Sequence, residues 1–180
     1  MKKAVILVAV ALLLAVVLIA GVIFIPALMN PVIEYDSRVT IDAPKADVWR
    51  AFNDDKKTKQ WIKGLESIEL VSGEKRQPGS RYRLVVNNEG EKVEMIETIE
   101  EVKEGELFAF TLDAEPLTDN VRVTFEEKDG KTEMVQYDSV KAKGIIWQTL
   151  FYWMQSTFQQ STQEHLERFK NLVEEEQKGR

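Results

Sequence analysis

The stretch VTIDAPKADVWRAF, residues 39–52, contains a change from one type of secondary structure to another. At its start, Val39 and Ile41 alternate with polar residues, which is typical of a strand with one buried face. Pro44 suits the first turn of a helix, and apolar side chains recur behind it at helical spacing. The stretch therefore predicts a strand over residues 35–41 followed at once by a short amphipathic helix.

The residues that follow predict an α+β arrangement. A second short helix ends near Trp61, and six strand-like runs come after it: 65–71, 80–86, 92–102, 107–112, 121–127 and 131–142. Asp129-Gly130, between the last two runs, is a strong hairpin signal. The apolar alternation slips between Met95 and Ile96, which predicts a β-bulge at that point.

The last predicted element is a long helix over about residues 145–176. The residues of one stripe recur on it every three or four positions: Trp147, Phe151, Met154, Phe158, Ser161, His165, Phe169 and Leu172. Antiparallel strands joined by short turns need a cover for one face of their sheet. Only this helix is long enough to provide that cover.

The amino end carries no charge from Ala4 to Ile33. The 22 residues of Ala4–Ile25 would form a helix of about 33 Å, which matches a hydrocarbon core of ~30 Å. A buried core helix without polar residues does not suit a domain of this size. A cleaved signal peptide is the main alternative, but its apolar part is shorter, and no convincing small-x-small cleavage site follows. We expect residues 1–30 to form a retained transmembrane anchor and residues 34–180 to form one domain.

The basic residues near the anchor suggest its orientation. Lys2 and Lys3 precede the apolar segment, whereas Arg38 and Lys45 follow it among acidic residues. Because Lys and Arg near a span favour the cytoplasmic side, we expect a single-pass protein with a cytoplasmic amino end and an extracytoplasmic domain. Gly21 alone makes no small-xxx-small dimer motif, and the sequence leaves the oligomeric state open.

Composition excludes several classes of function. The chain has 180 residues, with 24 Lys and Arg against 30 Asp and Glu. Without Lys2 and Lys3 there are 22 basic and 30 acidic residues, a net charge of −8, which argues against nucleic acid as a partner. The absence of Cys excludes disulfides, thiolate metal sites and a cysteine nucleophile, and a single His excludes a multi-histidine metal centre. We predict no cofactor, no metal site and no catalytic set.

Several motifs spread over residues 35–176 together resemble the START-like, or SRPBCC, superfamily. They are the 39–52 stretch, Trp61 after the second short helix, Pro78-Gly79-Ser80 before a strand, the segment from Ile99 to Phe110, and Gly144 before the long helix. This superfamily includes polyketide cyclases, lipid-transfer START domains and plant pathogenesis-related allergens. The motifs are signatures of a fold, and none of them is a catalytic signature.

The resemblance implies a helix-grip fold. In this fold a curved antiparallel sheet of about seven strands wraps a long carboxyl-terminal helix, and two short helices follow the first strand. The resemblance also implies a cavity between sheet and helix, which members use for lipids, sterols, polyketides and other apolar molecules. Several members are carriers or sensors and a minority are enzymes, and fold alone does not separate them.

Ten residues are predicted to line such a cavity. They lie on the strands or on the stripe of the long helix: Tyr82, Phe110, Met134, Gln136, Asp138, Trp147, Phe151, Met154, Phe158 and His165. Gln136 and Asp138 point inward only if their side of the last strand does, since the opposite side carries Val135 and Tyr137. His165 is either a polar handle or general base in the cavity, or a core histidine. The aromatic start of the helix is ordinary core, cavity wall or a surface for lipid headgroups.

Three functions are compatible with these patterns. The first is a membrane-tethered domain that binds a hydrophobic small molecule or lipid by burying it. The second is an enzyme of the polyketide cyclase/dehydrase kind, in which His165 acts with Asp138 or Tyr82 as acid and base. The third is an interaction scaffold at the membrane, whose acidic face recruits a partner and whose sheet and helix pack without a cavity.

Overall fold

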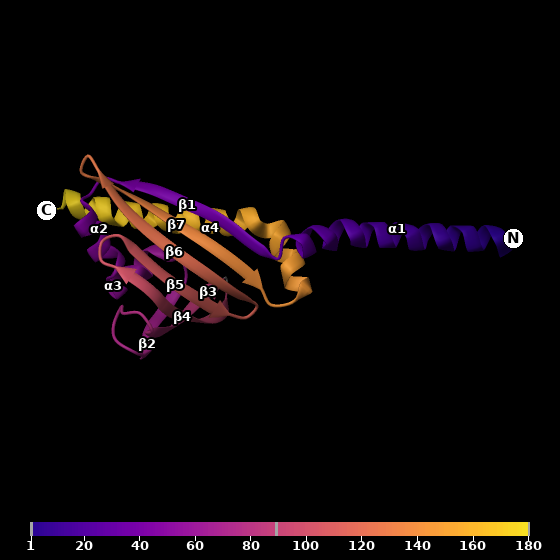
Figure 1. The fold of residues 1–180 in the computed structure, drawn as a ribbon, viewed down its shortest axis with the longest axis horizontal. Coiled ribbons are helices and arrows are strands. Elements are labelled where there is room, and N and C mark those ends of the chain that lie inside the picture. The colour runs from indigo at the N-terminus through magenta and orange to yellow at the C-terminus, as the bar shows by residue number, and fades with distance from the viewer. Residues whose placement is uncertain (1, 89, 180) are drawn as a thin grey trace.

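The computed structural model describes residues 2–88 and 90–179 of the chain. Its elements are α1 (Lys2–Met29), β1 (Val32–Ile41), α2 (Lys45–Phe52), α3 (Asp55–Trp61), β2 (Leu65–Ser72), β3 (Arg81–Asn88), β4 (Glu91–Lys103), β5 (Leu107–Ala114), β6 (Leu117–Lys128), β7 (Lys131–Ala142) and α4 (Ile145–Lys178). The predicted α+β helix-grip fold is confirmed: a curved antiparallel sheet of seven strands lies along one long carboxyl-terminal helix (Figure 1).

The strands follow the order β1-β7-β6-β5-β4-β3-β2 across the sheet. Strands β2 to β7 form a meander, because each of them pairs with the next along the chain. β1 joins the far edge by pairing with β7, from Val32 opposite Lys141 to Ile41 opposite Thr132. The connection from β1 to β2 therefore crosses from one edge of the sheet to the other, and α2 and α3 lie in this connection.

The outer edge of β1 is covered by glutamine side chains of α4. Gln159 Nε2 donates to the Asp36 carbonyl at 2.9 Å. Gln163 donates to the Arg38 carbonyl at 3.0 Å and accepts from the Arg38 N–H at 3.2 Å. An uncovered strand edge offers its backbone groups to other chains. These glutamines, which lie off the apolar stripe, therefore protect the edge and hold α4 along β1.

The β-bulge of β4 lies at a different place from the predicted one. The pairing of β4 with β5 shifts register between Ile99 and Glu101, whereas the sequence predicts the shift at Met95 and Ile96. Pairing of β3 with β4 runs past both of those residues without interruption. Met95 and Ile96 are both half-buried, so apolar residues occur in succession without an inserted residue.

The inward side of β7 is the side that carries Asp138. Met134, Asp138 and Val140 are buried, whereas Tyr137 is 39% exposed. Of the two orientations that the sequence leaves open, the structure therefore has the one that turns Gln136 and Asp138 toward α4.

The main core lies between the sheet, the two short helices and the carboxyl-terminal half of α4. Aromatic rings form its centre. The ring of Phe169 lies 6.0 Å from that of Phe52 and 5.3 Å from that of Trp61, and Phe52 lies 5.5 Å from Phe108, between ring centroids. Edge-to-face contacts of this kind add to the stabilisation from buried area. The helix that begins at Pro44 thus delivers Phe52 into the contact between sheet and α4.

The amino-terminal half of α4 extends beyond this core. Phe151 packs with Ile33 and Val140 in a second, smaller cluster. Trp147 and Met154, which belong to the predicted stripe, are 43% and 39% exposed. The reason is geometric, because the first turns of α4 lie beside the end of α1 and not over the middle of the sheet.

α1 is long and apolar enough to cross a membrane, and its apolar window is not buried against the domain. Figure 1 shows it projecting from the end of the domain at which α4 begins, with the two chain termini at opposite ends. Two hydrogen bonds join the helices: Gln148 Nε2 donates to the Ala27 carbonyl at 2.6 Å, and Trp153 Nε1 donates to the Ile23 carbonyl at 3.3 Å. The start of α4 is therefore attached to the last turns of α1.

Candidate ligand-binding site

A cavity of about 210 Å³ lies between the sheet and α4. Strands supply most of its apolar wall: Leu84, Val86, Met95, Phe110, Leu112 and Val121. Polar residues line it from the strands and from α4: Glu97, Asp119, Gln136, Asp138, Thr162 and His165. The end of α3 completes the lining with Trp61, Ile62 and Lys63. A largely apolar cavity with a few polar groups is the usual form of a small-molecule site.

A larger hollow of about 670 Å³ lies on the surface beside α2. Its lining includes charged residues such as Lys45, Arg50 and Glu104, and it is open to solvent. An open, charged groove leaves a bound apolar molecule in contact with water and so gains little from the hydrophobic effect. We therefore place the candidate site in the smaller cavity between the sheet and α4, whose lining is more apolar.

The ten predicted cavity residues are distributed over three regions. Four line the cavity: Phe110, Gln136, Asp138 and His165. Two are buried in the main core: Tyr82 and Met134. Four lie on the amino-terminal half of α4, two of them in the second cluster and two exposed: Phe151, Phe158, Trp147 and Met154. Because this half of α4 lies toward α1, its stripe does not reach the cavity.

The other lining residues are not among the predicted ten, and four of them carry polar groups that matter for the site: Trp61, Glu97, Asp119 and Thr162. Two of them have a recognisable signal in the sequence. Glu97 alternates with Ile99 on the inward side of β4, and Asp119 alternates with Val121 on the inward side of β6. A carboxyl at an inward strand position is unusual, because a buried charge is costly. Searching each predicted strand for acidic residues in phase with its apolar residues would have found Glu97. It would have missed Asp119, because the predicted run begins at residue 121 whereas β6 begins at Leu117.

Asp138 and Asp119 form a carboxyl pair on the neighbouring strands β7 and β6. Asp138 Oδ1 accepts from Gln136 Nε2 at 2.8 Å, and Asp119 Oδ1 accepts from the Ser139 N–H at 3.1 Å. Burial raises the pKa of Asp138, and the nearby charge of Asp119 raises it further. Burial also raises the pKa of Asp119, although the Ser139 N–H offsets part of this effect. The pair therefore holds a proton more readily than exposed carboxyls do.

His165 lines the cavity from α4. Burial lowers the pKa of its ring, and the charge of Arg168 lowers it further, so the imidazole is neutral at neutral pH. In residues 2–88 and 90–179, no side chain hydrogen-bonds to this ring. An acid–base pair needs its two groups within hydrogen-bond reach. The structure therefore forms no such pair between His165 and either Asp138 or Tyr82.

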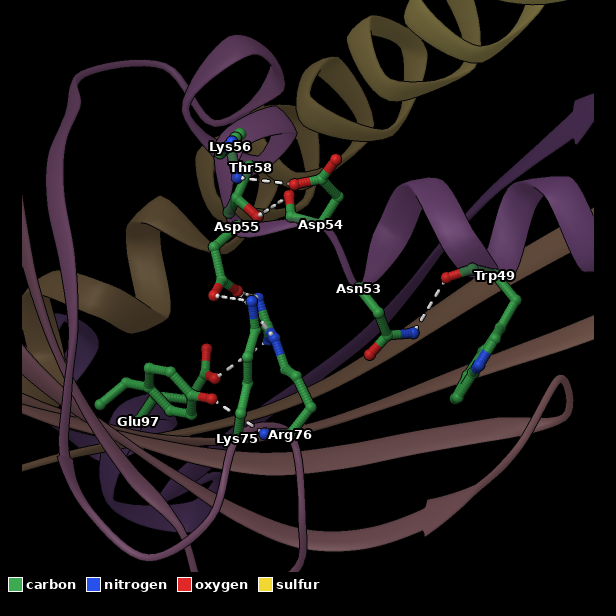
Figure 2. A network of polar contacts seen from close by, with 10 residues as sticks. Trp49, Asn53, Asp54, Asp55, Lys56, Thr58, Lys75, Arg76 and Glu97 are labelled. Carbon is green, nitrogen blue, oxygen red and sulfur yellow. Dashed lines mark hydrogen bonds and ion pairs between the residues drawn. The ribbon is translucent and has the colours of Figure 1, made fainter.

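Glu97 also belongs to a charged network around Arg76, which Figure 2 shows. The guanidinium of Arg76 donates to Asp55 Oδ1 at 3.0 Å through Nε and at 2.7 Å through Nη2. Its Nη1 lies 3.5 Å from Glu97 Oε1, and its backbone N–H donates to the Tyr82 hydroxyl at 2.9 Å. In Figure 2, Lys75 and Arg76 both point toward Asp55. Tyr82 thus supports the loop that carries Arg76.

The net pKa shifts of the two carboxyls in this network have opposite directions. Burial raises the pKa of Glu97, and the charge of Arg76 offsets only part of this rise. Burial alone would also raise the pKa of Asp55, but the hydrogen bond from Lys75 and the charge of Arg76 outweigh it, so that this pKa is lowered. Arg76 therefore stabilises the charged form of both acids, and it is the cation that makes Glu97 tolerable at the edge of the cavity.

The loop between β2 and β3 holds Arg76 in an unusual backbone conformation. Arg76 has a φ of 56°, which non-glycine residues rarely adopt. Gly73 begins this loop with a φ of 87°, and a Cβ at that position would come within 2.6 Å of Ser80 Cα. Glycine is therefore needed where the loop turns against Ser80, and the turn places Arg76 over Asp55 and Glu97.

Comparison with known proteins agrees with this architecture. A family model described as Activator of Hsp90 ATPase homolog 1-like protein matches residues 42–174. No curated protein matches the chain. Among solved structures, the protein TTHA0849 from Thermus thermophilus is similar with a TM-score of 0.65 and 22% identity, over 78% of this chain and 96% of that one.

Two further solved structures represent different members of the same fold. The ZhuI aromatase/cyclase from Streptomyces sp. R1128 is similar with a TM-score of 0.66 and 14% identity, over 79% of this chain and 94% of that one. Ara h 8.0201 is similar with a TM-score of 0.64 and 18% identity, over 79% of this chain and 97% of that one. At such identities the likeness shows the fold alone.

Proposed function

Because this chain belongs to the Activator of Hsp90 ATPase homolog 1-like family, within the START-like or SRPBCC superfamily, we propose that it is a membrane-tethered domain that binds a hydrophobic small molecule. The observation that carries the proposal is the cavity of about 210 Å³ between sheet and α4. An apolar ligand that enters the cavity leaves water and contacts apolar side chains, and each buried methylene contributes about 0.8 kcal/mol to the free energy of binding. The domain shields its ligand for transport, sensing or presentation.

The size of the cavity narrows the choice of ligand. Sites for drug-sized molecules have volumes of about 300–1,000 Å³, whereas this cavity has about 210 Å³. A two-chain membrane lipid is therefore too large to be enclosed. Of the two ligand types that the sequence predicts, a small molecule fits this volume better than a lipid does.

A cyclase-like enzyme is the second candidate, because an aromatase/cyclase is among the structurally similar proteins. Asp138 and His165 both line the cavity, as such an enzyme would need. The imidazole, however, has no hydrogen-bond partner among the described residues. This geometry favours binding without turnover. The cavity itself argues against the third candidate, a scaffold with a filled interior.

We predict that Val121→Phe weakens ligand binding at least about tenfold, a loss that corresponds to roughly 1.4 kcal/mol. Val121 is 3% exposed and lines the cavity, so a larger ring at this position occupies the space of the ligand. The full chain in lipid nanodiscs is titrated with 2-phenylethanol, and the dissociation constant is taken from the chemical shifts of cavity residues. Val71→Phe is the matched control, because Val71 is 55% exposed on β2. Equal affinity in wild type and Val121→Phe would contradict the proposed site.

Membrane tethering is supported by α1 and by an exposed apolar surface that continues from it. We call this surface the junction patch, and it consists of six residues of α4: Ile145, Ile146, Trp147, Leu150, Trp153 and Met154. Hydrogen bonds from Gln148 and Trp153 attach this part of α4 to the last turns of α1. A membrane-spanning α1 would therefore hold the junction patch at the headgroup layer, where aromatic side chains are favoured.

Lipids brominated near the headgroup end of their acyl chains should quench the fluorescence of Trp147 and Trp153 in nanodiscs. We expect the quenched fraction to be lost in the Trp147→Phe/Trp153→Phe double variant, because Trp61 is buried in the main core and Trp49 packs against that core. Trp49→Phe is the control and should keep the quenching. Unchanged quenching in the double variant would contradict docking through the junction patch.

A reporter enzyme fused to the carboxyl end tests the proposed orientation, with the domain outside the cytoplasm.

A further inference from the structure

Three buried side-chain polar atoms lack a hydrogen-bond partner in the described part of the chain: Trp61 Nε1, Glu97 Oε1 and Asp138 Oδ2. All three belong to residues that line the cavity between sheet and α4. Buried polar atoms are nearly always hydrogen-bonded, and leaving one unpaired costs about 1–3 kcal/mol. Three unpaired atoms around one cavity of about 210 Å³ therefore indicate that a polar group of a ligand supplies the missing hydrogen bonds.

To pair all three atoms, the bound group must contain both a hydrogen-bond donor and a hydrogen-bond acceptor. The indole N–H of Trp61 only donates, so it needs an acceptor. Asp138 Oδ1 already accepts from Gln136 at 2.8 Å, which leaves Oδ2 without a partner. Because the pKa of Asp138 is raised, this oxygen donates when it carries the proton and accepts when it does not. Glu97 Oε1 has the guanidinium of Arg76 at 3.5 Å as an ion pair but receives no hydrogen bond. A hydroxyl group both accepts and donates, whereas a hydrocarbon does neither and a carboxylate only accepts.

The charges around the cavity argue against an acidic ligand. Glu97, Asp119 and Asp138 all line it. Of the nearby cations, Lys63 and Arg168 are exposed, and the guanidinium of Arg76 is shared with Asp55. A carboxylate bound in this cavity would lose its hydration and face three protein carboxyls, and both effects are unfavourable.

We infer that the cavity binds a small apolar molecule that carries one or more hydroxyl groups, and that it excludes apolar carboxylic acids. The inference rests on the proposed function, because it assigns the chemistry of the ligand at the same site. The apolar side chains of Phe110, Leu112 and Val121 enclose the hydrocarbon part. The hydroxyl accepts from Trp61 Nε1–H and donates to Asp138 or Glu97, which makes these three residues determinants of specificity.

Three probes with the same aromatic ring test the inference: 2-phenylethanol, ethylbenzene and phenylacetate at neutral pH. A cavity without polar function would prefer ethylbenzene, because it is the most apolar of the three. We expect the reverse order, with 2-phenylethanol binding at least about tenfold more tightly than ethylbenzene and phenylacetate not binding. The indole N–H resonance of Trp61, assigned with Trp61→Phe, should shift with 2-phenylethanol and not with phenylacetate.

Asp138→Leu should remove the preference for the alcohol, because it replaces the carboxyl with an apolar side chain of similar length. Ethylbenzene should then bind at least as tightly as 2-phenylethanol. Glu133→Leu is the matched control, since it removes an exposed carboxyl from the outer side of the same strand, and it should keep the tenfold preference. Where Asp138→Leu does not fold, Trp61→Phe provides the second variant, which loses the donor and should lower the preference several-fold.

Equal affinity for alcohol and hydrocarbon in the wild type would overturn the inference and leave the proposed function intact. Binding of phenylacetate as tight as that of the alcohol would also overturn it. If none of the three probes binds to the wild type and Val121→Phe behaves identically, the proposed function fails instead. The two failures are therefore distinguishable within one set of titrations.

Discussion

Arg76→Met will lower the free energy of unfolding by about 3–5 kcal/mol, the range expected when a buried ion pair loses one partner. Glu97 is only 6% exposed, and Arg76 is the cation that pairs with it in the part of the chain that the structure describes. Methionine fills a volume similar to that of the arginine stem. Like arginine it has a Cβ, so the positive φ of residue 76 is no less favourable in the variant. The loss therefore reports on the missing charge, and it is measured by urea unfolding of the full chain in non-ionic detergent.

Two further variants isolate the role of the Glu97 pair. Lys75 also binds Asp55, at 2.9 Å, but its side chain is 64% exposed. Lys75→Met should therefore cost less than about 1 kcal/mol. Arg76→Met combined with Glu97→Leu should recover most of the loss, because apolar replacements of buried ion pairs are often neutral or stabilising. A loss for Arg76→Met no larger than that for Lys75→Met would contradict the assignment.

The stability of Arg76→Met should also depend on pH. Burial holds the pKa of Glu97 above its value in the unfolded chain. The stabilisation from a proton on this carboxyl is complete below the unfolded pKa and is lost as pH rises through the folded pKa. Removing the charge of Arg76 moves the folded pKa still higher, so the deficit of the variant should shrink as pH falls below neutrality. The double variant lacks the carboxyl and should not show this recovery.

Phe169→Ala should lower the free energy of unfolding by about 3–5 kcal/mol, because it removes a fully buried ring from the main core. Phe169 is 0% exposed, and its ring contacts those of Phe52 and Trp61. These contacts join α4 to both short helices, so the substitution loosens the packing that holds the helix against the sheet. Thermal and urea unfolding of the full chain measure the effect.

Trp153→Ala provides the control on the same helix. It removes a larger ring, but this ring is 57% exposed, so the expected change is about 1 kcal/mol or less. A loss in Phe169→Ala no greater than that in Trp153→Ala would show that the aromatic core does not hold α4. We expect the larger loss of stability in Phe169→Ala, because Phe169 is the more buried of the two residues.

Much of the fold could be predicted from local patterns. The alternation around Val39 predicts β1, and Pro44 with the apolar residues behind it predicts α2. These predictions succeed because the period of a strand or helix depends on neighbouring residues only. The predicted bulge at Met95 and Ile96 is wrong for a related reason. Half-buried residues on both faces of β4 produce the same succession of apolar letters as an inserted residue does.

The candidate site was less predictable. Asp138 could be selected only together with an assumption about which side of β7 points inward. The stripe on α4 predicts five cavity residues between Trp147 and His165, yet of these only His165 reaches the cavity. Arg76 has no periodic signal, because it lies in a loop, and its partners come from α3 and β4.

The sequence by itself determined the order of the elements, the apolar amino-terminal helix and the set of residues that share each face. All of these depend on composition and on short periods within one element. Only the tertiary structure decided which face of β7 is inward, which half of α4 covers the sheet, and which polar atoms remain unpaired around the cavity. The cavity is the space left between α3, α4 and five strands, and no local period within one element describes how separate elements pack against one another.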